Sequence, residues 1–143
     1  MILLDTNIIS ELMRPVPDAS VQAWIDGQSP TEIGTTAVCY AEIRYGIATL
    51  PEGRRRREMH AAAERIFLEL FKDAVLPFDA SAATVYAELA AEHRRTGRTV
   101  GILDLQIAAI ARAHDATLAS RNTRHFRDCG IELIDPFTPT AGR

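Results

Sequence analysis

Apolar residues along the chain fall into two patterns: short continuous runs and longer stretches of helical periodicity. The short runs predict five β-strands, which are Met1–Leu4, Ile33–Thr36, Val75–Phe78, Thr117–Ala119 and Ile131–Ile134. The stretches between them predict six helices, which are Ile8–Met13, Val21–Gly27, Ala37–Leu50, Arg54–Lys72, Ala80–Thr96 and Ile102–His114. Strands that alternate with helices are typical of a parallel sheet covered on both faces, so the pattern predicts an α/β fold.

Turn and capping residues agree with these boundaries. Pro51 and Gly53 separate the third helix from the fourth. Asp79 stands where the N-cap of the fifth helix belongs, and Gly97 stands where that helix is expected to end. Parallel α/β sheets bind ligands beyond the carboxyl ends of their strands, so the polar residues that follow each strand are the first candidates for a site.

The bulk composition indicates an ordinary globular protein. The chain has 143 residues, of which 47% are hydrophobic and 24% charged, and this suits a single domain over residues 1–143. No apolar run approaches the roughly 20 residues that cross a membrane. The start, MILLDTN, has no basic leader of the kind found in signal peptides. Cys39 and Cys129 are far apart and have no metal-ligand spacing. We therefore expect a cytoplasmic protein with no membrane contact.

The charge distribution is more informative than its sum. A formal net charge of −3 argues against binding to nucleic acid by bulk attraction. Lys72 is the only lysine, and the arginines cluster at residues 54–57, 94–98 and 121–127. Arginine forms forked hydrogen bonds with phosphate oxygens. The clusters are either solvated helix faces or phosphate contacts, and the sequence leaves both open.

Three acids occupy unexpected places in this pattern. Asp5 closes the first strand at the expected crevice, where its plainer role is to cap the next helix. Glu42 shares a helix face with apolar and small residues and no basic partner; the plainer reading is a partly exposed acid at the edge of that stripe. Asp104 lies within an apolar stripe, where its plainer role is to favour the helix dipole from the first turn.

If these acids lie close together in the fold, a proton or a cation must compensate their negative charges. Two carboxylates about 5 Å apart repel each other by about 3 kcal/mol at an effective dielectric constant of about 20. Either one carboxyl group takes a proton or a cation lies between them. Hard oxygen ligands, with no histidine or cysteine expected nearby, favour Mg²⁺, with Mn²⁺ as the alternative. A divalent ion with positions left for water and phosphate suits phosphodiester hydrolysis.

Four motifs resemble the PIN-domain ribonucleases, in particular the VapC-type and FitB-like toxins of type II toxin–antitoxin pairs. The motifs are LLDTNIISEL at Leu3–Leu12, AEIRYG at Ala41–Gly46, ILDLQIAAIA at Ile102–Ala111 and ASRNTRHF at Ala119–Phe126. They lie in the family's order over nearly the whole chain. The resemblance implies a three-layer α/β/α fold whose five-stranded parallel sheet has the order 3-2-1-4-5. It also implies cleavage of RNA, a homodimer and a VapB-like antitoxin, which alone contacts operator DNA.

The resemblance also implies roles for single residues. Asp5 and Asp104 match direct metal ligands, and Glu42 matches a third acid that binds the metal directly or through water. Asn7 and Ser120 match polar positions that support the site.

Two positions depart from the family pattern. Asn122 stands where many PIN domains have a fourth catalytic acid, and its amide brings no charge. His125 stands where close relatives often have another acid. Both departures weaken a second metal site.

The resemblance further implies in-line attack by water, which leaves a 5′-phosphate and a 3′-hydroxyl. Arg121 and Arg124 follow the fourth strand and are expected to hold the RNA backbone. A two-component receiver domain is excluded because Lys72 precedes a strand, and a haloacid-dehalogenase-like phosphatase because Asn7 replaces its second aspartate. The remaining alternative is an inert PIN-fold module that binds RNA or a protein partner.

Overall fold

The computed structural model describes residues 1–138 and contains one parallel sheet of five strands. The strands are β1 (Ile2–Leu4), β2 (Ile33–Thr36), β3 (Val75–Leu76), β4 (Thr117–Ala119) and β5 (Leu133–Ile134). Their order in the sheet is β3-β2-β1-β4-β5, which confirms the predicted topology. The central strand β1 pairs with both β2 and β4, with Ile2 opposite Ile33 on one side and Thr117 on the other.

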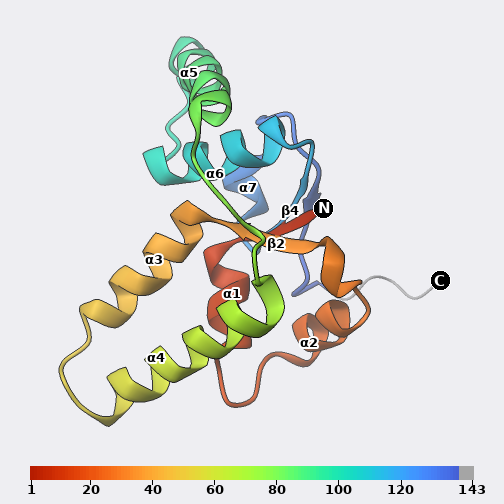
Figure 1. The fold of residues 1–143 in the computed structure, drawn as a ribbon. Helices are drawn as coiled ribbons and strands as arrows, with labels where there is room; N and C mark the ends of the chain where they lie inside the picture. Colours follow the sequence, from red (N-terminus) through yellow and green to blue (C-terminus); the bar gives the residue numbers. More distant parts are fainter. Residues whose placement is uncertain (139–143) are drawn as a thin grey trace.

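Helices cover both faces of this sheet, and Figure 1 shows α5 and α6 on one side of the strands and α1, α2 and α4 on the other. The longer helices begin and end close to the predicted positions. Asp79 accepts a hydrogen bond from the Ala82 backbone N–H at 2.9 Å, so it caps α5 as expected. Within residues 1–138 no helix is long and apolar enough to cross a membrane. The helices are α1 (Thr6–Leu12), α2 (Ala19–Asp26), α3 (Ala37–Ala48), α4 (Arg54–Ile66), α5 (Ala80–Arg95), α6 (Ile102–Ala113) and α7 (Thr123–Phe126).

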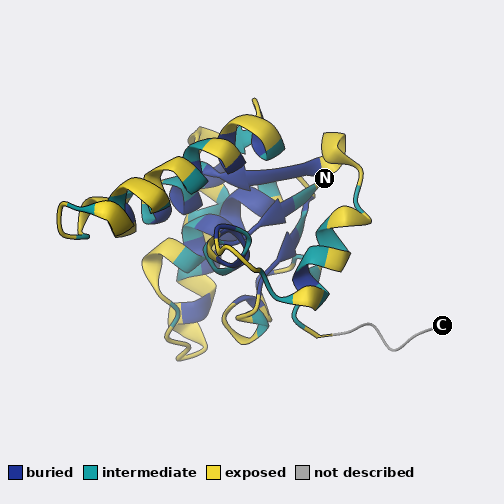
Figure 2. Cartoon of the chain, turned by 90° about the horizontal axis from the view of Figure 1, so that it is seen from below, coloured by how far each residue is buried: buried dark blue, intermediate teal, exposed yellow. Residues whose placement is uncertain are grey.

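The core lies between the sheet and these helices. Figure 2 shows the strands as a buried centre and the helices with buried inner and exposed outer faces. Leu3, Leu4 and Leu118 are fully buried, as continuous apolar runs in a parallel sheet predict. Thr35 is also fully buried, and its hydroxyl donates to the Leu4 carbonyl at 2.7 Å, which satisfies this polar group within the core.

The fourth predicted helix ends earlier than its pattern indicates. The α-helix stops at Ile66 and continues as a turn of π-helix over Phe67–Phe71. This turn places both Phe67 and Phe71 in the core, and Lys72 then leaves the helix with φ of 45°. Residues four apart share one face of a helix, so both rings point into the core, but the apolar pattern does not reveal the change to a π-helical turn.

Gly34 in β2 occupies a position where even a methyl group does not fit. A Cβ there would lie 2.9 Å from the Ala74 carbonyl oxygen, which is held by a hydrogen bond from the Thr35 N–H. We expect Gly34→Ala to lower the free energy of unfolding in urea by roughly 1–3 kcal/mol. The control is Gly46→Ala in α3, which meets no atom within 4 Å and should raise stability by roughly 0.5–1 kcal/mol. Equal stability of the two variants would contradict the close approach at Gly34.

Candidate active site

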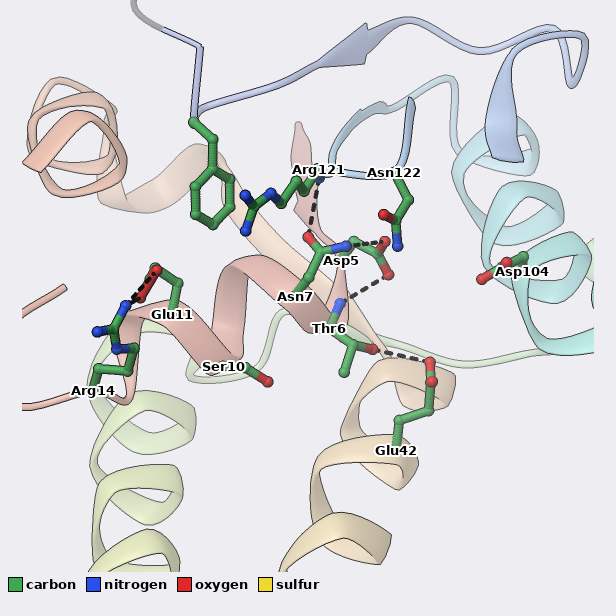
Figure 3. A pocket seen from close by; sticks show the side chains of 11 residues that line it. Asp5, Thr6, Asn7, Ser10, Glu11, Arg14, Glu42, Asp104, Arg121 and Asn122 are labelled. Atoms are coloured by element: carbon green, nitrogen blue, oxygen red, sulfur yellow. Dashed lines mark hydrogen bonds and ion pairs between the residues drawn. The ribbon is translucent and has the colours of Figure 1, made fainter. Parts of the chain in front are cut away.

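A pocket of about 490 Å³ opens at the carboxyl ends of the central strands. Its walls come from α1, from the first halves of α3 and α6, and from the segments that follow β4 and β5 (Figure 3). The three acids singled out in the sequence face this one pocket although they lie far apart along the chain. The lining residues are Asp5, Thr6, Asn7, Ser10, Glu11, Arg14, Glu42, Asp104, Arg121, Asn122 and Phe137.

Asp5 is the most enclosed of the three acids, with 4% of its surface exposed. Its Oδ1 accepts a hydrogen bond from the Thr6 backbone N–H at 2.8 Å, so it caps α1 as well as facing the pocket. Its Oδ2 accepts one from the Ser120 hydroxyl at 2.7 Å. Burial raises the pKa of Asp5, these hydrogen bonds oppose that rise, and the charge of Asp104 adds to it. The ionised form is therefore disfavoured in a way that a bound cation relieves.

Glu42 is half-buried in α3 and is linked to Asp5 through Thr6. The Thr6 hydroxyl donates to Glu42 Oε1 at 2.9 Å, while the Thr6 N–H donates to Asp5. Burial raises the pKa of Glu42, and the negative charges of Asp5 and Asp104 raise it further. The next turn of this helix face is exposed at Tyr45, so Glu42 lies at the edge of the buried stripe. The charge of Asp104 thus contributes to the raised pKa of both Asp5 and Glu42.

Asp104 lies in the first turn of α6, where the buried face of that helix meets the pocket. Ile107 and Ala108, one turn further on, are fully buried, whereas the Asp104 side chain is 30% exposed. Its Oδ2 lies 3.0 Å from the Nδ1 atom of His125, which comes from α7. Asp104 therefore lies where a carboxylate favours the dipole of α6, and it also lines the same pocket as Asp5 and Glu42.

The expectation that no histidine or cysteine lies near the acids is wrong. His125 contacts Asp104, and the Cys39 Sγ atom lies 3.8 Å from Asp5 Oδ1. His125 arrives on α7, a short helix that the apolar pattern does not predict, and Cys39 lies one turn before Glu42 on α3. Burial raises the pKa of the Cys39 thiol to about 12, so it remains protonated and donates to Asp5 instead of acting as a thiolate ligand.

Asn7 and Ser120, the two residues predicted to support the site, both form hydrogen bonds with Asp5. The Asn7 side-chain amide donates to Asp5 Oδ2 and to Ser120 Oγ, each at 3.3 Å. The Asn122 backbone N–H donates to Ser120 Oγ at 3.0 Å, and the Asn122 side chain lines the pocket near Asp5 (Figure 3). These bonds fix the orientation of the Asp5 carboxyl group and tie the loop after β4 to α1.

The two arginines expected to hold RNA lie in different places. Arg121 lines the pocket, and its backbone N–H donates to Asn7 Oδ1 at 3.1 Å. Arg124 is exposed on α7 and does not line the pocket. Arg14 lines it and is a residue that the sequence pattern gave no reason to select; its guanidinium pairs with Glu11 at 2.8 Å.

Within the described residues, no three histidine, cysteine, aspartate or glutamate side chains are close enough to form a complete metal site. Each acid is instead held by a protein partner: Asp5 by Ser120, Glu42 by Thr6, and Asp104 by His125. The donor chemistry nevertheless fits a hard divalent cation, because carboxylate oxygens from three elements face one pocket. Burial, with a smaller contribution from the neighbouring acids, raises the pKa of Asp5 and of Glu42, and a bound cation would favour their ionised forms.

Comparison with known proteins places this geometry in a family, because the model of the PIN domain matches residues 2–131. The chain belongs to the PIN-domain family. Among the relatives of this PIN-domain chain is VapC ribonuclease Y4jK of Sinorhizobium fredii, which is 41% identical over 97% of this chain and 99% of its own length. Toxin FitB of Neisseria gonorrhoeae is 36% identical over 96% of this chain and 99% of its own.

Solved structures show the same architecture. The structure of FitAB bound to an IR36 DNA fragment contains a chain that is 35% identical to this PIN domain. The two superpose with a TM-score of 0.90 and cover 100% of each chain. The fold inferred from strand pattern and motif order is therefore the fold of PIN-domain toxins.

Proposed function

We propose that this PIN-domain chain is a divalent-metal-dependent endoribonuclease that acts as the toxin of a type II toxin–antitoxin pair. The observation that carries the proposal is the pocket where Asp5, Glu42 and Asp104 face one another across three separate elements. Such a pocket is suited to a cation and a phosphate. The relatives named as a ribonuclease and as a toxin support RNA as the substrate. We take residues 1–143 as one functional domain.

Asp5, Glu42 and Asp104 would hold the ion, with Mg²⁺ as the expected metal and Mn²⁺ as the alternative. When bound, the ion supplies charge that neutralises the scissile phosphate and makes its phosphorus more electrophilic. Asn122 lines the same pocket as a neutral amide, so it assists through hydrogen bonds and adds no charge for a second ion. Asn7 and Ser120 keep the Asp5 carboxyl group in place.

The remaining steps belong to side chains of the pocket. Glu42 accepts the proton of the attacking water, a role that suits an acid whose pKa is raised. Arg121 binds a phosphate oxygen of the RNA from the opposite wall, and Arg124, outside the pocket, contacts the backbone further along. In-line attack then leaves a 5′-phosphate on one product and a 3′-hydroxyl on the other.

A VapB-like antitoxin is the proposed partner, and operator DNA is contacted only through it. The likeness to the FitAB structure on DNA supports this arrangement. A groove between the α1–α2 connection and α4 suits a partner segment, since Leu12, Met13 and Met59 line it beside Arg55 and Arg65. We place the protein in the cytoplasm, where an RNA-cleaving toxin meets its substrate.

We also propose that the toxin is a homodimer. Tyr45, Ile102 and Leu103 are apolar but 72%, 64% and 49% exposed. Tyr45 and Leu103 line a shallow apolar pocket that borders Glu42 on α3 and α6. Burying these side chains against a second copy would remove from water an apolar surface that borders Glu42.

The proposed function is tested with purified protein freed of any partner. We expect single-stranded RNA to be cut with Mg²⁺ or Mn²⁺, left intact with EDTA, and cut again when the metal is restored in excess. The fragments should carry 5′-phosphates, which a 5′-phosphate-dependent exonuclease detects. Binding of RNA without cleavage under both metals would instead support the inert PIN-fold module, which the neutral Asn122 makes the main alternative.

A further inference from the structure

The pocket extends beyond Asp5, Glu42 and Asp104 to a second end, where Arg121 is the one residue to which the proposed cleavage gives a role. Arg14, Glu11, Arg121 and Phe137 line this end, away from Asp104 and Glu42 (Figure 3 shows the first three). The chain therefore builds a wall of aromatic and cationic groups beside the acidic one. Such a combination is typical of surfaces that bind unpaired nucleotides.

Phe137 is placed in the pocket by a turn after β5. The Asp135 carboxylate accepts hydrogen bonds from the Phe137 N–H at 3.0 Å and from the Thr138 hydroxyl at 3.1 Å. Pro136 within this turn is buried, whereas Phe137 is only partly buried against the core and still lines the pocket. The ring is therefore held by the turn and keeps surface available to a ligand.

Arg121 completes the same surface. Its guanidinium carbon lies 4.5 Å from the centre of the Phe137 ring, a cation–π contact that holds the two side chains together. Among residues 1–138, no carboxylate lies within salt-bridge distance of Arg121, whereas Arg14 is paired with Glu11. Of the two arginines of this wall, Arg121 is thus the one available to pair with a phosphate.

The position of this surface relative to the acids is fixed by hydrogen bonds. Arg121 directly follows Ser120, whose hydroxyl donates to Asp5, and its own N–H donates to Asn7. Asn7 in turn donates to Asp5. Asp5 and Arg121 are therefore joined through one side chain, which places the aromatic surface next to the phosphate that is cut.

We propose that Arg121 and Phe137 form a nucleotide subsite that stacks the base adjacent to the scissile phosphate. The inference rests on the proposed ribonuclease function and names a specificity determinant for it. The base lies against the layer made by the ring and the guanidinium, and the guanidinium edge binds a phosphate oxygen. Unstacked RNA bases are recognised by stacking of this kind on aromatic rings and arginine planes.

The test measures base stacking separately from cleavage. Short single-stranded RNAs carry aminopurine, a fluorescent adenine analogue quenched by stacking, at one position in turn. They are added to the Asp104→Asn protein, so no cleavage is needed. We expect one position to be quenched on binding, and Phe137→Ala in this background to lose that quench and bind roughly tenfold more weakly. Phe137→Trp should restore both signals. Phe78→Ala removes a half-buried ring outside the pocket and should change neither.

A second arm uses the protein with all its acids. An RNA that lacks the base at the quenched position should be cut about tenfold more slowly by the wild type, and Phe137→Ala should show no such sensitivity. A quench that persists in Phe137→Ala, or the absence of any quenched position, overturns the subsite. If no RNA is cut but the quench behaves as expected, the proposed function fails and the subsite stands.

Discussion

Replacing Asp104 with asparagine should lower the rate of RNA cleavage about a thousandfold, which corresponds to the several kcal/mol that a bound metal contributes to such a reaction. The substitution removes one of the three carboxylates proposed to hold the metal, Asp5, Glu42 and Asp104. An asparagine oxygen still accepts a hydrogen bond from His125 Nδ1 when that nitrogen carries a proton. We therefore expect the fold to survive, and single-turnover cleavage of a labelled RNA measures the effect.

The matched control is Asp73→Asn, because Asp73 is an exposed aspartate outside the pocket. It should leave the cleavage rate unchanged. Calorimetric titration with Mn²⁺ supplies an independent readout, since the heat of binding should fall in Asp104→Asn alone. Undiminished cleavage by a well-folded Asp104→Asn protein would remove this residue from the metal site.

Replacing Glu42 with glutamine should slow cleavage and stabilise the metal-free protein at the same time. The loss of a base that accepts the proton of water corresponds to roughly a hundredfold to ten-thousandfold in rate. The pKa of Glu42 is raised above its usual 4.5 by burial and by the neighbouring acids, so its ionised form destabilises the fold at every pH above the folded pKa. Glutamine removes that charge, and its oxygen still accepts the Thr6 hydroxyl bond.

The size of this effect depends on pH, and its sign depends on the metal. In EDTA near neutral pH, Glu42→Gln should unfold at a higher temperature than the wild type. The gap should close as the pH falls through the raised pKa of the folded protein toward 4.5, because the wild-type carboxyl group gains its proton over that range. Saturation with Mn²⁺ should reverse the order, because a ligand at a hundred times its Kd adds about 2.7 kcal/mol only to protein that binds it. Glu52→Gln, an exposed control, should follow the wild type throughout. A destabilised, metal-free Glu42→Gln protein would contradict the repulsion described here.

The strands of the sheet were predictable because each is marked by an apolar run of consecutive residues. Leu3 and Leu4 belong to a continuous apolar run that marks a buried parallel strand, and both are fully buried. The helix caps at Asp79 and Gly97 were likewise visible in the residues themselves. By contrast, α7 is a single turn with no amphipathic repeat, and the π-helical turn before Lys72 depends on packing against the sheet. Neither leaves a periodic trace in the sequence.

In the candidate site, too, the residues marked by a local pattern were predictable and those brought together by the fold were not. Asp5, Glu42 and Asp104 stood out because an acid interrupts or closes an apolar pattern, and the structure brings all three to one pocket. Their metal-binding roles stay predictions. The partners that hold them were hidden: Thr6 and His125 become neighbours of Glu42 and Asp104 only through the fold. Contacts between residues so far apart in the sequence follow from the topology of the fold, and the identity of a single residue does not reveal them.

The central place of β1 has a consequence for synthesis of the protein in the cell. Strand β1 leaves the ribosome long before Thr117–Ala119, the segment with which it pairs in the sheet. A nascent chain that ends before this segment lacks the Ser120 that orients Asp5, and one that ends before α6 also lacks Asp104. The acid-lined pocket therefore comes together only after Ser120 has been synthesised, and a shorter nascent chain lacks a complete site.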